Sequence, residues 1–249
     1  MSENAYPFDA ASIDVQFNAR PGSSAPAIIS HRLRKPTLQE LIDREKAINL
    51  EIVETSNREE QIVTDDDAAN CQLWDRLIVE VKGYAGVTDW QSLTDSQKAQ
   101  MRPGHKRTAI VAMYAGSAQV VGGEDDEISL AMDSWTIRQL VGPDAENPIY
   151  TIDHVLREPT ESERARFKRN ASKVSFVRGA KRPRTKIGAD LRAYVEMYDA
   201  LVTSIDGGTV AGKTLGESDR AAFLAAIDPT WKRVIVQTLM NAIEAALLD

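Results

Sequence analysis

One stretch of the chain has the residue types and the spacing of a phosphate-binding loop. Residues 207–214 read Gly-Gly-Thr-Val-Ala-Gly-Lys-Thr, which matches the pattern G-x-x-x-x-G-K-[ST]. Such a loop follows a buried strand and holds phosphate with backbone N–H groups where a helix begins. The residues before it, 191–205, instead have the apolar spacing of a helix. We therefore favour a glycine-rich connection between helices, and we keep a P-loop nucleotide-binding protein as an alternative.

The other residues that could do chemistry lack partners at a suitable spacing. Metal binding or hydrolysis by His31, His105 or His154 would need carboxylates or cysteines at ligand spacing, and the sequence offers none. Cys71, the single cysteine, lies in an apolar helical pattern typical of a small buried side chain. The acidic run 65–67 fits a helix start, where carboxylates meet the positive end of the helix dipole. We therefore predict no catalytic residue, no metal and no cofactor, and a protein that is not an enzyme.

Charge is distributed very unevenly along the chain. The formal net charge is −7, yet residues 157–186 contain 11 lysines and arginines and 3 glutamates. This basic surface suits either the phosphates of a nucleic acid or the acidic face of a protein. The second is favoured because residues 178–184 contain no aromatic side chain for base stacking, and a merely solvated face is the remaining alternative. The residues of the predicted basic surface are Arg164, Arg166, Lys168, Arg169, Arg178, Lys181, Arg182 and Arg184.

Two similar heptads indicate the elements that position these residues. Residues 31–37 read HRLRKPT, and residues 154–160 read HVLREPT. Each begins in a predicted strand, which ends before proline because proline disfavours the helical conformation of its predecessor. Each threonine is then a helix N-cap, with a glutamate three residues later completing a capping box. The predicted structural motif comprises His31, Leu33, Arg34, Pro36 and Thr37 in the first heptad and His154, Leu156, Arg157, Pro159 and Thr160 in the second.

The similarity continues beyond the heptads at a nearly constant offset. Residues 73–78 align with 197–202 at an offset of 124, and residues 103–107 align with 229–233 at an offset of 126. Similar segments in the same order and spacing indicate two copies of one unit. Each copy is predicted to contain a strand, a helix, a β-hairpin and three helices, the hairpins lying at about 50–64 and 174–187. The aligned stretch of the first copy, 34–67, has 5 basic and 10 acidic residues, the opposite balance to the basic surface.

We therefore predict an α+β fold made by tandem duplication of a mainly helical unit. Between the copies, residues 127–133 and 135–141 have the apolar pattern of strands, after a turn at 122–126. The predicted organisation is an N-terminal extension with a short strand (1–27), a first repeat unit (28–116), a small β-rich connector (117–147) and a second repeat unit (148–249). We call the two repeat units the first copy and the second copy.

The order of strand, Leu-Arg-x-Pro-Thr and amphipathic helix resembles a pattern found in tail assembly chaperones and neighbouring proteins of tailed bacteriophages. Residues 33–37 and 156–160 carry the resemblance, which covers a short segment of each copy. It implies a phage-like setting and a structural or assembly role.

The leading prediction is a non-enzymatic structural or assembly protein of a phage-like particle. Its two repeat units would present oppositely charged surfaces to other structural or assembly proteins or to a second copy of the chain. A phage tail assembly chaperone and a nucleic-acid-binding accessory protein using the basic surface are the alternatives. We expect the protein in the cytoplasm of the host cell, with incorporation into a virion left open. No membrane contact is expected, because no run of apolar residues is long enough to span a bilayer and the chain begins without a signal-peptide pattern.

Overall fold

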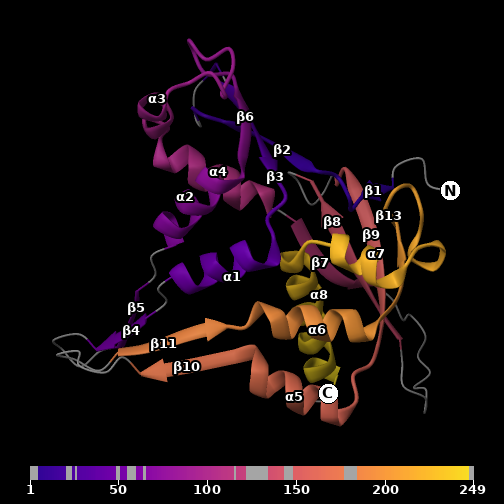
Figure 1. The fold of residues 1–249 in the computed structure, drawn as a ribbon. Coiled ribbons are helices and arrows are strands. Elements are labelled where there is room, and N and C mark those ends of the chain that lie inside the picture. The colour runs from indigo at the N-terminus through magenta and orange to yellow at the C-terminus, as the bar shows by residue number, and fades with distance from the viewer. Residues whose placement is uncertain are drawn as a thin grey trace. The chain divides into compact units, whose positions relative to one another are not determined.

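The computed structural model of the chain (Figure 1) describes residues 5–20, 24–25, 27–48, 51–54, 60–63, 66–114, 116–121, 134–142, 148–176 and 184–246. Its fold is α+β, as predicted. The chain divides into two compact units, each assembled from segments that are separated in the sequence. The amino-terminal unit comprises Ala10–Tyr114 and Ser172–Ala189, and the carboxyl-terminal unit comprises Met1–Asp9, Ala115–Ala171 and Asp190–Asp249.

The amino-terminal unit contains an antiparallel sheet covered by helices. The sheet has the order β2-β3-β6, with β2 at Ser12–Asn18, β3 at Ile28–Arg34 and β6 at Ile78–Lys82. The helices are α1 (Leu38–Ala47), α2 (Asp66–Leu77), α3 (Asp95–Ala99) and α4 (Pro103–Met113). Helix α2 packs against α1, α4 and strand β3, and Leu33, Leu77 and Ile110 are completely buried.

Two β-hairpins complete the amino-terminal unit. One consists of β4 (Glu51–Glu54) and β5 (Glu60–Val63), and the other of β10 (Ser172–Phe176) and β11 (Arg184–Ala189). Both hairpins are predicted from the sequence and are confirmed. The sequence does not predict that the two hairpins pair with each other. Strand β11 runs antiparallel to β4, with Lys186 opposite Glu51, and the sheet has the order β10-β11-β4-β5. A strand of the basic segment therefore lies beside a strand of the acidic one within a single chain.

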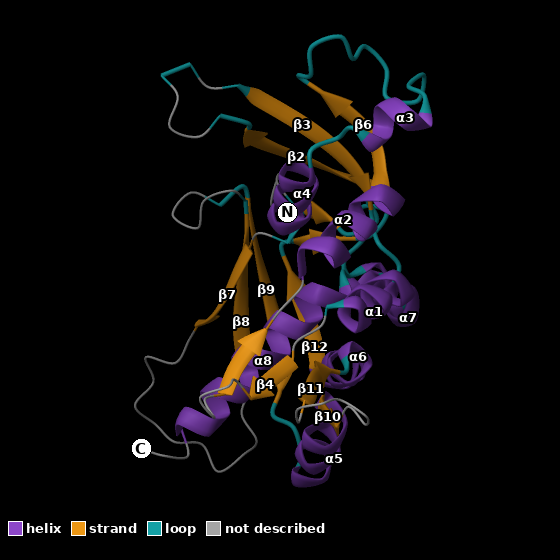
Figure 2. Cartoon of the chain, turned by 90° about the vertical axis from the view of Figure 1, so that its left-hand side faces the viewer, coloured by secondary structure: helices purple, strands orange, loops and turns teal. Residues whose placement is uncertain are grey.

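The carboxyl-terminal unit is built on a second antiparallel sheet. Its order is β12-β9-β8-β7, and these strands span Val202–Asp206, Tyr150–Arg157, Ser134–Val141 and Gly116–Val121. The helices are α5 (Glu161–Ala171), α6 (Leu191–Leu201), α7 (Arg220–Ala226) and α8 (Pro229–Ala246), with a 3₁₀ turn η1 at Leu215–Glu217. Helix α8 lies against α6 and strands β7 and β8 (Figure 2), and it buries Ile235, Val236 and Leu239 in the core.

The segments outside the two predicted repeat units also contribute strands. The strand expected in the N-terminal extension is β2, whereas β1 (Tyr6–Pro7) pairs in parallel with β13 (Gly208–Thr209) of the carboxyl-terminal unit. From the predicted connector, the apolar run 135–141 lies in β8, which pairs with β9. The strand predicted at 127–133 and the turn at 122–126 lie outside the described residues.

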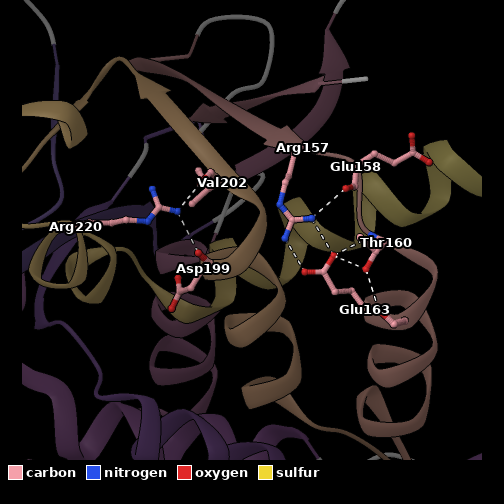
Figure 3. A network of polar contacts seen from close by, with 8 residues as sticks. Arg157, Glu158, Thr160, Glu163, Asp199, Val202 and Arg220 are labelled. Carbon is pink, nitrogen blue, oxygen red and sulfur yellow. Dashed lines mark hydrogen bonds and ion pairs between the residues drawn. The ribbon is translucent and has the colours of Figure 1, made fainter. Parts of the chain in front are cut away.

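The prediction of helical structure over residues 191–205 is wrong at its carboxyl end. Helix α6 stops at Leu201, and residues 202–206 form strand β12 with no intervening turn; β6 follows α2 in the same way. Val202 and Ile205 continue the helical spacing of α6, which hides the strand, but β-branched side chains favour a pleated sheet. Arg220 holds this junction by donating to the carbonyl oxygens of Asp199 and Val202 (Figure 3).

Candidate functional site

The Leu-Arg-x-Pro-Thr motif forms the corner between a strand and a helix in both copies. In the second copy, the Arg157 guanidinium donates to both carboxylate oxygens of Glu163, at 2.9 and 2.6 Å, and to the carbonyl oxygen of Glu158 at 3.2 Å (Figure 3). The same carboxylate accepts from the backbone N–H of Thr160 at 2.9 Å, and the Glu163 N–H donates to the Thr160 hydroxyl. Leu156 and Pro159 are buried. Every residue of the motif with a fixed identity is therefore either buried or hydrogen-bonded.

The first copy repeats these contacts one for one. Arg34 donates to both carboxylate oxygens of Glu40 and to the carbonyl of Lys35, and Thr37 and Glu40 form the predicted capping box. The hydrogen bonds from arginine hold the carboxyl pKa values of Glu40 and Glu163 near 2, below the ordinary value. Sequence reasoning found the capping boxes but missed the arginine partner, although arginine and glutamate are six residues apart in both copies.

His31 is buried within a chain of hydrogen bonds that runs from Trp74 to His105. The Trp74 indole N–H donates to His31 Nδ1 at 3.0 Å, and His31 Nε2 lies 2.8 Å from the Tyr84 hydroxyl. Because an indole can only donate, the proton of neutral His31 sits on Nε2 and is donated to Tyr84. The Tyr84 hydroxyl lies 3.0 Å from His105 Nδ1 and can donate to it. Burial lowers the His31 pKa to about 4, so this side chain is neutral at pH 7.

His154 has the equivalent arrangement in the second copy. Its Nδ1 lies 2.7 Å from the Tyr198 hydroxyl, and its Nε2 lies 3.2 Å from Gln139 Oε1. Since the Gln139 oxygen can only accept, Nε2 carries the proton and Nδ1 accepts from Tyr198, as His31 accepts from Trp74. Burial lowers the His154 pKa to about 3. The structural role predicted for the two strand histidines thus has a definite form, a hydrogen bond to an aromatic residue of the second helix.

A lysine beneath each aromatic ring completes the arrangement. Lys106 Nζ lies 5.0 Å from the centre of the Trp74 ring and 2.6 Å from Asp75 Oδ1. Lys232 Nζ lies 5.4 Å from the Tyr198 ring and 2.6 Å from Asp199 Oδ1. Burial lowers the Lys232 pKa, while Asp199 opposes that shift. Sequence reasoning missed these pairs, although both lysines occupy the same place in the aligned segments 103–107 and 229–233.

The two buried histidines predict that stability falls in mild acid. Because their folded-state pKa values are depressed, their contribution is complete above the unfolded pKa of about 6.5 and is lost as pH falls towards 4. Between pH 7 and pH 5 the free energy of unfolding should drop by about 2 kcal/mol per histidine. Urea titrations at both pH values measure this drop, and His154→Gln should make it smaller. A free energy that does not change between pH 7 and 5 would contradict the assignment.

The described residues of the predicted basic surface lie on helix α5 and strand β11. On helix α5, Arg164 pairs with Glu161, Arg166 with Glu196 and Lys168 with Glu244, at 2.6, 3.4 and 3.0 Å, and Arg169 is exposed. Arg178, Lys181 and Arg182 lie outside the described residues, and Arg184 is placed in β11 by its backbone alone. Three cations of α5 therefore face carboxylates of this chain.

The segment that matches a phosphate-binding loop is a tight turn at the edge of the sheet. It follows the edge strand β12, and Val210 and Lys213 close the turn with reciprocal backbone hydrogen bonds of 2.9 and 3.0 Å. The N–H groups of Gly207 and Ala211 donate to the carboxylates of Asp206 and Asp9. Beyond it lies the three-residue η1 rather than an α-helix. Carboxylates thus occupy two of the donors that phosphate would need. The predicted connection between two helices is nevertheless wrong, because strand β12 leads directly into the segment.

Other groups fit structural roles. Cys71 is half-buried rather than buried as predicted. Burial still raises the pKa of its thiol, which donates to the Pro103 carbonyl oxygen at 3.6 Å, so the thiol is not activated. Among the residues that the structure describes, no group of three or more His, Cys, Asp or Glu side chains could hold a metal ion. None of the helices in the described ranges is long and apolar enough to cross a membrane.

Comparison of the chain with protein-family models, curated proteins and solved structures found no match.

Proposed function

We propose that the chain is a non-enzymatic structural or assembly protein of a phage-like particle, built from two copies of one unit. The observation that carries the proposal is the recurrence of one set of contacts at equivalent positions. Arginine binds the helix-capping glutamate, a strand histidine accepts from an aromatic residue, and a lysine pairs with the next aspartate. The elements also recur in order, with β2-β3-β6 in one sheet and β8-β9-β12 in the other.

A glycine after the last strand of each set recurs as well. Gly83 follows β6 and Gly207 follows β12, with φ of +89° and +79°. A Cβ at either would lie within 3 Å of a carbonyl oxygen, that of Ile28 or of Thr151. Matching backbone constraints of this kind support descent of both halves from one unit.

The internal contacts of the polar motif residues support a role in which the protein acts by binding partners at its surface. The histidines and the corner arginines that could suggest chemistry are all committed to internal contacts in both copies. The repeated contacts therefore maintain the scaffold of each copy. We expect partners to be recognised where the two copies differ. The pairing of β11 with β4 places a strand of the basic segment beside a strand of the acidic one within the chain, so we expect partners to bind other faces.

Sedimentation velocity tests this proposal. The purified chain, alone and mixed with the products of adjacent genes, is expected to form a complex heavier than the monomer. A strictly monomeric chain that binds none of these products would contradict it. Salt-sensitive binding of DNA that is lost on reversing the charges of Arg178, Arg182 and Arg184 would favour the nucleic-acid alternative.

A further inference from the structure

Residues Tyr6–Asp9, which we call the arm, pack into the carboxyl-terminal unit, whereas the chain from Ala10 onward begins the amino-terminal unit. Strand β1 of the arm pairs in parallel with β13 (Figure 1). Phe8 is 1% exposed, and the centre of its ring lies 5.6 Å from that of Phe223 and 6.4 Å from that of Trp231. The arm lies outside both predicted repeat units, yet it supplies part of the core of the second copy.

Main-chain hydrogen bonds hold the arm in an extended conformation. The N–H groups of Tyr6 and Phe8 each donate at 2.8 Å to a carbonyl oxygen of the segment 207–209. The Asp9 carboxylate accepts from the backbone N–H of Ala211 at 2.9 Å. Proteins that bind extended peptides use the same combination of main-chain hydrogen bonds for affinity and side-chain pockets for specificity. The carboxyl-terminal unit therefore holds the arm as it would hold a peptide ligand.

Gly208 provides the space that the Phe8 ring occupies. A Cβ at position 208 would lie 2.1 Å from Phe8 Cε2, so a side chain there would exclude the ring. We call the space bounded by Gly208, Phe223 and Trp231 the slot. The counterpart of Gly208 in the first copy is Tyr84, at the sequence offset of 124. The second copy thus has a glycine and the ring of the arm where the first copy has an aromatic side chain of its own.

The two aromatic rings lie beside equivalent residues. In the first copy, the centres of the Tyr84 and His105 rings are 5.9 Å apart. In the second copy, the centre of the Phe8 ring lies 6.4 Å from that of Trp231, which is the counterpart of His105. The first copy is therefore closed by its own residues, whereas the second copy contains a binding site for a segment from outside the repeat unit.

We propose that the slot also binds the arm of another molecule of this chain, so that two molecules associate by exchanging arms. The hydrogen bond between Asp9 and Ala211 joins residues 202 positions apart, so the same contact can form between two chains. Two residues, Ala10 and Ala11, separate the arm from strand β2 of the amino-terminal unit. Exchange of an identical element between protomers is a low-cost route to a dimer. This inference rests on the proposed function, since it names another molecule of the chain as a partner.

Two variants that block opposite halves of the contact test the exchange. Gly208→Ala closes the slot and leaves the arm intact, and position 208 has no positive φ that would strain an alanine. Phe8→Ala removes the ring of the arm and leaves the slot empty. A mixture of the two variants has a free arm and a free slot in different molecules. In sedimentation velocity the mixture should form a 1:1 complex, and each variant alone should not associate through the arm.

Gly216→Ala is the matched control for the slot variant. No atom lies within 4 Å of a Cβ added at Gly216, so the arm of this variant stays in its own slot. An arm of the same chain competes at an effective concentration in the millimolar range. Gly216→Ala mixed with Phe8→Ala should therefore form roughly tenfold less complex, or even less. Equal amounts of complex in the two mixtures would show that the arm is not what joins the molecules.

A peptide with the sequence of residues 5–11 provides a second measurement. It should raise the melting temperature of Phe8→Ala, and the same peptide with alanine in place of Phe8 should not. If Phe8→Ala does not fold, Tyr6→Ala replaces it in both experiments, because Tyr6 is only half-buried.

Separate monomers in the mixture of Gly208→Ala and Phe8→Ala would overturn the inference. If the wild-type chain still forms a complex with adjacent gene products, only the exchange of arms then fails. If the wild type also forms no complex of any kind, the proposed function fails as well.

Discussion

Replacing Lys232 by methionine should lower the free energy of unfolding by about 3 kcal/mol, the low end of the range for breaking a buried ion pair. The Lys232 side chain is 3% exposed, and its Nζ lies 2.6 Å from Asp199 Oδ1. Methionine keeps most of the buried volume but removes the cation from Asp199 and from the Tyr198 ring. The low end applies because the Asp199 side chain is itself 35% exposed, so water recovers part of the loss.

The first copy offers a matched control for this substitution. Lys106 makes the equivalent contact, but its partner Asp75 is 54% exposed. Lys106→Met should therefore cost only about 1 kcal/mol, as for an exposed pair. Adding Asp199→Asn to Lys232→Met should restore at least half of the lost stability, because no unpaired carboxylate then remains. Equal losses for the two lysine variants in urea titrations would contradict this account.

Gly207→Ala should destabilise the chain by about 3 kcal/mol through backbone strain and steric overlap. Gly207 has a φ of +79°, and an added Cβ would lie 2.3 Å from the carbonyl oxygen of Thr151 in β9. That oxygen belongs to the backbone of a central strand, so it cannot rotate away as a side chain could. Thermal or urea unfolding measures the loss.

The same turn contains the control for this variant. Gly212 has a φ of +73° with no atom within 4 Å of an added Cβ, so Gly212→Ala should cost only about 1 kcal/mol. Gly83→Ala should behave like Gly207→Ala, because its Cβ would lie 2.6 Å from the Ile28 carbonyl oxygen. A Gly207→Ala variant as stable as Gly212→Ala would contradict this prediction, because it would show that the backbone of β9 moves to accommodate the added Cβ.

The sequence patterns predict the corners better than the sheets. Threonine, glutamate and proline act within a few residues of one another, so the helix starts at Thr37 and Thr160 follow from local rules. Strands β6 and β12 were missed because their apolar residues continue the period of the preceding helix without a turn. The pairing of β4 with β11 joins residues more than 130 positions apart, and no local pattern specifies such a partner.

The contacts of the candidate site were only partly predictable. A structural role for His31 and His154 follows from their equivalent places in two strands, but their partners Trp74 and Tyr198 come from a helix 43 or 44 residues later. The groove of about 410 Å³ between α5 and α6 could not be foreseen from composition. Phe167 and Ala200 line it where the first copy has Arg44 and Arg76, and these residues come together only once both helices are placed.

Native mass spectrometry of the tagged chain, co-expressed with the genes adjacent to its own, tests the proposed assembly function most directly. The account predicts a complex of defined stoichiometry that contains this chain and at least one neighbouring product or a second copy of the chain. It also predicts that the complex persists in the Lys213→Ala variant, since no role in assembly is proposed for the Lys213 side chain. Recovery of the chain as a monomer alone, at every concentration and with every neighbour, would contradict the account.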